Sequence, residues 1–81
     1  MRLLKFYQEN CAPCKSVDTF LKNNDVEFQD IHAFDQAHLS AAYAIGSVPT
    51  LILLNDDGNE VGRSIGFKPE EIKALVSQFL I

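Results

Sequence analysis

The chain has 81 residues and a formal net charge of -4, with 47% hydrophobic and 22% charged residues. Because domains commonly run to about 100–150 residues, this length predicts one small domain over residues 1–81, and the composition excludes a disordered or collagen-like chain. The seven basic residues are scattered along the sequence, whereas a nucleic-acid-binding surface needs clustered basic charge.

The first half of the chain predicts strand, helix, strand and helix. An apolar run with aromatic residues over 3–7 favours a strand covered on both faces. Apolar residues at helical spacing predict a helix over 11–24, in which Pro13 falls in the tolerant first turn. Alternation over 26–31 predicts a second strand parallel to the first, and an alanine-rich segment over 35–46 predicts a short helix that ends at a glycine.

The second half predicts a hairpin followed by a helix. An apolar run over 48–54 and a strand over 60–65 are separated by Asn-Asp-Asp-Gly-Asn, which is typical of a turn. Pro69 and two glutamates open an amphipathic terminal helix. The order β-α-β-α-β-β-α predicts an α/β fold with a four-stranded mixed sheet and helices on both faces. The expected core residues are Phe6, Phe20, Phe28, Leu51, Leu53, Ile72, Leu75, Val76, Phe79 and Leu80.

The strongest chemical signal is the segment Cys11-Ala12-Pro13-Cys14, which lies between a predicted strand and a predicted helix. At a helix N-terminus, unpaired backbone N–H groups and the helix dipole stabilise a thiolate, so we predict that Cys11 is the nucleophile. Cys14 lies one helical turn deeper, where it could attack a mixed disulfide at Cys11. Pro13 shapes the first turn and removes one backbone donor.

The cysteine pair has two other interpretations. A structural zinc site needs about four ligands, so the two cysteines would have to recruit His32 and His38 or a carboxylate, and no second cysteine pair exists. A non-catalytic binding module with two inert cysteines is the other. We expect no metal, and we interpret both histidines as ordinary surface or half-buried residues.

Four features together resemble the thioredoxin superfamily, and more closely its compact thioredoxin-like and glutaredoxin-like members. They are the segment from Asn10 to Lys15, the run 47–50, Gly66 after the last strand, and the order of elements. The resemblance covers nearly the whole chain. It implies a thioredoxin-like fold, a cis peptide bond at Val48-Pro49 beside the cysteines, and a substrate strand that pairs with that backbone. It places substrate contacts at Asn10, Ala12, Pro13, Val48, Pro49 and Gly66.

The chain also departs from both branches of the superfamily. Asn10 and Ala12 stand where thioredoxins usually have tryptophan and glycine, and the usual extra N-terminal strand and helix are absent. Pro13 stands where glutaredoxins usually have tyrosine, and Gly66-Phe67-Lys68 replaces their double glycine and acidic residue. These differences alter the surface for partner proteins and weaken the expectation of glutathione binding.

Two positions near the cysteines carry charges opposite to those that thioredoxins usually have there. Lys5 stands six residues before Cys11, where thioredoxins resemble one another in having a buried aspartate, and Asp30 stands where they have a lysine. A lone charge in a covered strand is costly, so a Lys5–Asp30 ion pair is one hypothesis. In it, Lys5 supports the Cys14 thiolate or relays a proton. In the alternative, Lys5 extends to the sheet edge and Asp30 merely ends a strand.

These observations predict a thiol–disulfide oxidoreductase that reduces protein disulfides without a bound cofactor. The resemblance implies electrons from a flavoprotein thioredoxin reductase and makes ribonucleotide reductase a possible partner; a glutathione-dependent glutaredoxin-like carrier is the alternative. No apolar run approaches the roughly 20 residues of a membrane span, and the N-terminal apolar stretch is too short for a signal peptide. With only two cysteines, we expect a cytoplasmic protein with no membrane partner. The acidic charge favours a monomer.

Overall fold

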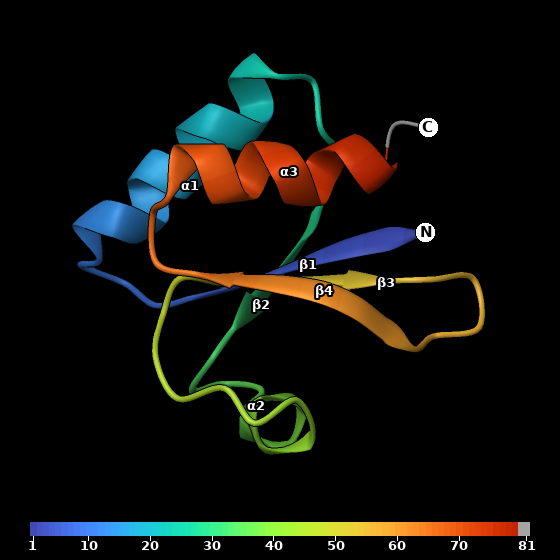
Figure 1. Cartoon of the computed structure of the whole chain (residues 1–81). Helices are drawn as coiled ribbons and strands as arrows, with labels where there is room; N and C mark the ends of the chain where they lie inside the picture. The colour runs from blue at the N-terminus through green and yellow to red at the C-terminus, as the bar shows by residue number, and fades with distance from the viewer. Residues whose placement is uncertain (80–81) are drawn as a thin grey trace.

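The computed structural model describes residues 1–79 and confirms the four-stranded mixed sheet flanked by three helices (Figure 1). The strands lie in the order β2-β1-β3-β4. β1 is parallel to β2 and antiparallel to β3, and β3 and β4 form the expected hairpin. The strands are β1 (Arg2–Tyr7), β2 (Gln29–His32), β3 (Thr50–Leu54) and β4 (Glu60–Ile65).

The helices cover both faces of the sheet, as the sequence predicted. The helices α1 (Ala12–Asn23) and α3 (Pro69–Phe79) lie on one face, and the short helix α2 (Ala37–Ala42) lies on the other (Figure 1). Residues of β1 alternate between the two sides because successive side chains of a strand point to opposite faces. Leu3 therefore belongs to the core beneath α1 and α3, whereas Leu4 and Phe6 belong to the core beneath α2.

Three predicted elements are shorter in the structure. β2 begins at Gln29 rather than at 26, because the N–H of Val26 donates to the carbonyl of Leu21 and keeps that segment against α1. β3 begins at Thr50 rather than at 48, since a cis peptide bond directly precedes it. α2 spans Ala37–Ala42 instead of 35–46, and Ala44 beyond it has a positive φ of 53°, which ends a helix.

The core confirms most of the assigned residues. The aromatic residues Phe20 and Phe28 differ, since they are only partly buried and pack against the rim of the core. Phe79 ends α3, but its side chain lies outside the described part of the structure, as does Leu80 altogether. Phe6, Leu51, Leu53, Ile72, Leu75 and Val76 are buried as predicted.

Gly62 allows α3 to approach the sheet closely. A Cβ atom at this position of β4 would lie 2.6 Å from Cδ1 of Leu75, which is closer than such atoms can pack. The close contact of α3 with β4 brings the start of α3 to the edge of the sheet where β4 ends. Among residues 1–79, no helix is both long enough and apolar enough to cross a membrane.

Candidate active site

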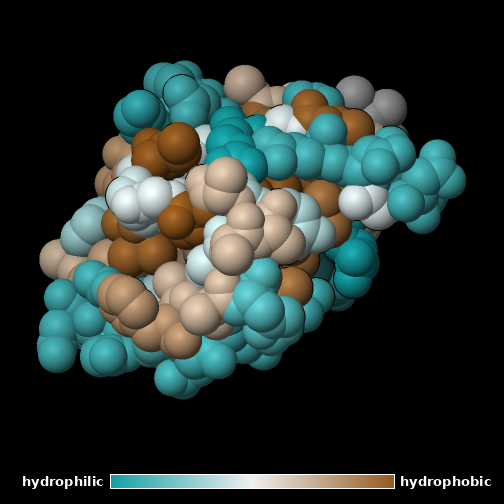
Figure 2. Space-filling view, turned by 90° about the horizontal axis from the view of Figure 1, so that it is seen from below, coloured by the Kyte–Doolittle hydropathy of each residue, from teal (hydrophilic) through white to brown (hydrophobic). Residues whose placement is uncertain are grey.

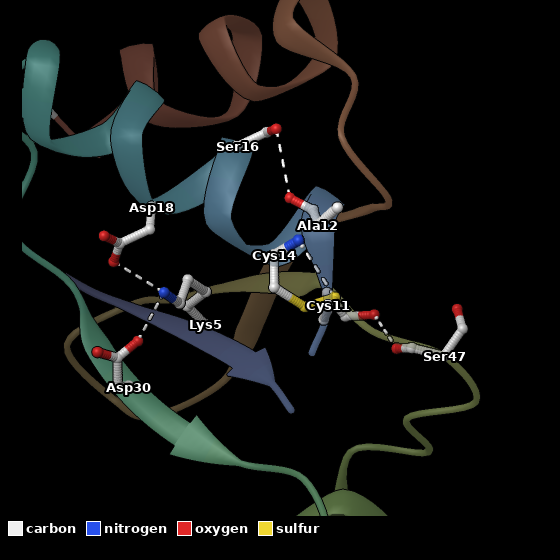
Figure 3. Close-up of a disulfide and its surroundings, with 9 residues drawn as sticks. Lys5, Cys11, Ala12, Cys14, Ser16, Asp18, Asp30 and Ser47 are labelled. Atoms are coloured by element: carbon white, nitrogen blue, oxygen red, sulfur yellow. Dashed lines mark hydrogen bonds and ion pairs between the residues drawn. A yellow bond between two sulfur atoms is a disulfide. The ribbon is translucent and has the colours of Figure 1, made fainter. Parts of the chain in front are cut away.

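The two cysteines form a disulfide where the chain leaves β1 and enters α1 (Figure 3). Cys11 is the N-cap of α1, and its Sγ accepts the backbone N–H of Cys14 at 3.2 Å. Both cysteines are buried, with 7% and 4% of their surfaces exposed. The neighbouring Asn10, Ala12 and Pro13 are exposed, so the structure surrounds the sulfur atoms with the accessible residues that the sequence assigned to substrate contact.

This position favours negative charge on Cys11. The first N–H groups of a helix have no partner within the helix, and the helix dipole adds a partial positive charge there. The N–H of Cys14 already points at the Cys11 sulfur, so a thiolate formed by reduction would receive the same hydrogen bond. Cys11 can therefore act as a nucleophile without rearrangement of the first turn of α1.

A cis peptide bond joins Val48 and Pro49, as the resemblance implied. Since Thr50 pairs with Phe6 in the antiparallel ladder, this bond lies beside the chain that leads from β1 to Cys11. Two hydrogen bonds fix the segment: Gly66 N–H donates to the carbonyl of Pro49 at 2.8 Å, and Thr50 Oγ1 donates to that of Ser47 at 2.8 Å. Within residues 1–79, the backbone of Val48 makes no hydrogen bond.

Position 66 requires glycine because of its backbone conformation, not because of limited space. Its φ is +83°, whereas a Cβ there would meet no atom within 4 Å. L-residues rarely adopt this region, and glycine does so without steric cost. The glycine thus turns the chain after β4 so that its N–H reaches Pro49.

Lys5 lies beneath the disulfide and is buried, with only 4% of its surface exposed. Its Nζ is 2.9 Å from Oδ1 of Asp30, so the predicted ion pair is present and Lys5 does not extend to the sheet edge. A second carboxylate, Asp18 of α1, also lies 2.9 Å from Nζ, and Lys22 contacts its other oxygen at 2.9 Å. Hydrogen bonds from Lys22 and then Lys5 lower the pKa of Asp18 below its usual value.

Asp18 is the residue that the sequence reasoning missed. It lies four residues after Cys14, on the same face of α1, which is the spacing that places a side chain one turn further along a helix. That spacing, together with a lysine in the covered strand, was the available signal. Asp30 is half exposed at the edge strand, so the expectation of a pair in wholly apolar surroundings holds for Lys5 alone.

Two hollows share Gln8, in the loop that leads to Cys11. A cavity of about 470 Å³ is lined by both cysteines and by Lys5 and Asp18. On the side of α2, apolar surface is gathered between hydrophilic regions (Figure 2), and a groove of about 530 Å³ there runs from Gln8 to Val48. The aromatic ring of Phe34, which is 69% exposed, borders this groove.

The loop that leads to Cys11 is tied to β2 through an ion pair. Nε2 of His32 contacts the carboxylate of Glu9, and in the neutral ring its Nδ1 accepts the N–H groups of Phe34 and Asp35, each at 3.2 Å. The hydrogen bond to Glu9 raises the pKa of His32, and the same bond lowers the pKa of Glu9. His38, by contrast, is exposed on α2.

The ion pair predicts pH-dependent stability. Because the pKa of His32 is raised above 6.5 in the folded chain, its contribution is present below about pH 6.5 and disappears as the pH rises through the raised value. The contribution of Glu9 is present above about pH 4.5 and is lost as the pH falls through its lowered value. We expect His32→Gln to lower Tm most between these limits and least near pH 8, measured by thermal unfolding.

The matched control for this measurement is His38→Gln, which replaces an exposed histidine on α2. Its Tm is expected to follow the unmodified chain at every pH. A His32→Gln deficit that is the same at pH 5.5 and pH 8 would contradict the electrostatic explanation.

Within the described residues, no group of three or more histidine, cysteine or acidic side chains is arranged to hold a metal ion. His32 is engaged with Glu9, and His38 lies on α2 away from the disulfide loop. The donor set for a four-ligand zinc site at the cysteines is therefore not assembled in this part of the chain.

Comparisons with known proteins agree with this geometry. The sequence profile of the family described as Thioredoxin matches residues 1–78. The SPbeta prophage-derived thioredoxin-like protein YosR of Bacillus subtilis is 40% identical over 78 residues, covering 96% of this chain and 98% of that protein. Thioredoxin of Bacillus subtilis is 34% identical over 85 residues, covering 96% and 81% respectively. The solved structure of thioredoxin 1 from Thermosipho africanus is similar with a TM-score of 0.76 and 25% identity, covering 99% and 94% of the two chains.

Proposed function

Because this chain belongs to the thioredoxin family and is a thiol–disulfide oxidoreductase, we propose that it reduces protein disulfides in the cytoplasm with electrons from a flavoprotein thioredoxin reductase. The observation that carries the proposal is the Cys11–Cys14 disulfide at the N-terminus of α1, in which the Cys11 sulfur already accepts a backbone hydrogen bond. This arrangement favours a thiolate on the residue that the substrate meets first.

The reaction proceeds by two exchanges. In the reduced protein, the Cys11 thiolate attacks one sulfur of the substrate disulfide, and the other substrate sulfur leaves as a thiolate that takes up a proton. Cys14 then loses its proton, and its thiolate attacks the Cys11 sulfur of the mixed disulfide. The Cys11–Cys14 bond forms, the second substrate sulfur leaves, and two electrons have passed from the protein to the substrate.

The substrate backbone is proposed to pair with Val48. Its N–H and carbonyl make no hydrogen bond within residues 1–79, while Pro49 and Ser47 on either side are held by Gly66 and Thr50. A free backbone between two fixed residues can accept an extended segment as an added strand. This geometry supports substrate contacts at the residues around the disulfide, namely Asn10, Ala12, Pro13, Val48, Pro49 and Gly66.

The test compares two sources of electrons. The oxidised protein is mixed with NADPH and thioredoxin reductase, and in parallel with glutathione and glutathione reductase, while reduction of insulin or another disulfide protein is followed. Fast turnover with the first system and little with the second is expected. Preference for glutathione would replace the proposal by the glutaredoxin-like alternative, and failure with both would favour a non-catalytic module.

Ribonucleotide reductase is a candidate among the protein substrates. It regenerates a dithiol by exchange, which the Cys11–Cys14 pair can supply. The same NADPH-coupled assay, with oxidised ribonucleotide reductase in place of insulin, tests this partner. Deoxynucleotide formation that depends on this protein is the expected result, and its absence would exclude the enzyme from the substrates.

A further inference from the structure

We propose that Lys5 is a positioning residue for Cys14: its ammonium group, held by Asp18 and Asp30, maintains a positive charge beneath the resolving thiol and stabilises its thiolate. The inference rests on the proposed function, because it concerns the second exchange, in which Cys14 attacks the mixed disulfide. The sequence left two roles open for Lys5, support of the Cys14 thiolate and proton relay. The inference selects the first of them.

The side chain of Lys5 lies between β1 and α1, on the face of the sheet that is covered by the helix carrying Cys14. Lys5 belongs to the set of β1 side chains that face α1, and it meets α1 through Asp18 at 2.9 Å. Asp18 lies one helical turn after Cys14 on the same face of α1. Lys5 and Cys14 line the same cavity, and Figure 3 shows the ammonium group lying between the two carboxylates, to the left of the disulfide.

Burial decides which of these charges acts most strongly on Cys14. The side chain of Lys5 is only 6% exposed, whereas those of Asp18 and Asp30 are 27% and 50% exposed. Water screens the carboxylates more than it screens the ammonium group, because electrostatic interactions weaken where solvent raises the local dielectric. The ammonium group of Lys5 is therefore the least screened of the three charges.

Four groups hold the Lys5 ammonium in place. Besides two carboxylates at 2.9 Å, the ammonium group lies over the rings of Tyr7 and Phe28, at 5.3 and 5.0 Å from their centroids. Aromatic faces attract cations at such distances. The two carboxylates and the two ring faces thus all complement a positive charge at this position.

Proton relay through this cluster is disfavoured. An ammonium group carries no free lone pair, so Lys5 cannot accept the proton that Cys14 loses. Hydrogen bonds from Lys22 and Lys5 lower the pKa of Asp18, which keeps that carboxylate ionised and a poor proton acceptor. The Cys14 proton therefore goes to solvent, and the thiolate electron pair forms the bond to Cys11.

Other charged groups near the disulfide are oriented differently. Lys15 lines the same cavity but is exposed, and Lys22 contacts Asp18 from the solvent side with 68% of its side chain exposed. Glu9 is paired with His32. Among these groups, Lys5 is the buried cation that shares a cavity with Cys14.

The test isolates Cys14 in a Cys11→Ser background, so that a single thiol titrates. Thiolate absorbance and the rate of alkylation by iodoacetamide are measured against pH. Adding Lys5→Met is expected to move the titration to higher pH and to lower the alkylation rate at pH 7 about tenfold, since a neighbouring opposite charge commonly shifts a pKa by about one unit or more. Circular dichroism confirms that each variant is folded.

The matched control is Lys22→Met, which removes an equally short ion pair to the same carboxylate from the exposed side. It is expected to leave the Cys14 titration unchanged. Lys5→Arg should preserve most of the effect because the charge remains, and Asp18→Asn should move the titration to lower pH because a negative charge is removed. Opposite shifts for Lys5→Met and Asp18→Asn would support a charge effect.

Two outcomes would overturn the inference. One is a Lys5→Met titration that matches that of Lys22→Met. The other is a shift to higher pH in both Lys5→Met and Asp18→Asn, which would show that the cluster acts only by holding the fold. Because thiol titration requires neither reductase nor substrate, failure of this inference is distinguishable from failure of the proposed function.

Discussion

Replacing Cys11 with serine is expected to abolish disulfide reduction, with a loss of about a thousandfold or more in turnover. A serine hydroxyl at the N-cap of α1 can keep the hydrogen bond from Cys14 N–H, which Cys11 makes at 3.2 Å, but it is not ionised at neutral pH and cannot form a disulfide. Cys14→Ser is expected to leave the first exchange intact and to stop the second. Turnover of insulin and non-reducing gels measure the two steps.

The two variants should therefore differ in whether they form a covalent adduct with the substrate. Cys14→Ser should accumulate a covalent adduct with the substrate that dithiothreitol releases, whereas Cys11→Ser should form none. Adducts of equal yield in both variants, or in Cys11→Ser alone, would reverse the roles assigned to the two thiols. A double variant serves as the control for nonspecific crosslinking.

Phe6→Ala is expected to destabilise the fold by about 3–5 kcal/mol. Phe6 is fully buried in the core beneath α2, where its ring meets that of Tyr43 at 5.9 Å in an edge-to-face arrangement. A chain of 81 residues has a free energy of unfolding of about 4–12 kcal/mol, taking roughly 0.05–0.15 kcal/mol per residue. The substitution should consume much of this stability, as urea unfolding followed by circular dichroism would show.

The matched control is Phe34→Ala, which removes the same side chain from a position that is 69% exposed. Its free energy of unfolding is expected to change by no more than about 0.5 kcal/mol, because surface substitutions rarely do more. Equal losses for the two variants would contradict the assignment of Phe6 to the core. A loss of disulfide reduction in Phe34→Ala without a loss of stability would instead place Phe34 in the substrate groove.

The hydrophobic pattern was sufficient for the order of elements. The two central strands are continuous apolar runs that are buried on both faces, whereas the apolar positions of α1 and α3 repeat with the helical period. α2 was the exception, because most of its residues are small and exposed. Its boundaries depend on backbone geometry at Ala44 that no hydrophobic pattern records.

The cysteine site was predictable from the sequence. Of the charge cluster beside it, the sequence predicted Lys5 and Asp30 but not Asp18. The spacing of Cys11 and Cys14, together with its place between a strand and a helix and with the run 47–50, predicted a redox pair, whereas an ion pair depends on which side chains the fold brings together. Lys5 and Asp30 lie directly opposite each other in adjacent strands, so a parallel strand pairing would have placed them together. Asp18 reaches the same point from a helix on top of the sheet, and this packing distance is not written in the local sequence.

Within residues 1–79 the backbone of Val48 makes no hydrogen bond, and this bears on how selective a protein that binds its substrate there can be. Backbone amides are the same in every polypeptide, so a site that recognises them does not read the order of side chains in its target. Discrimination then depends on the target's conformation: a disulfide must lie in a segment that can be extended and freed from its own sheet or helix. On this basis, unfolding or loosening a client protein around its disulfide would determine whether it is reduced, and one small redox protein could serve many clients of unrelated sequence.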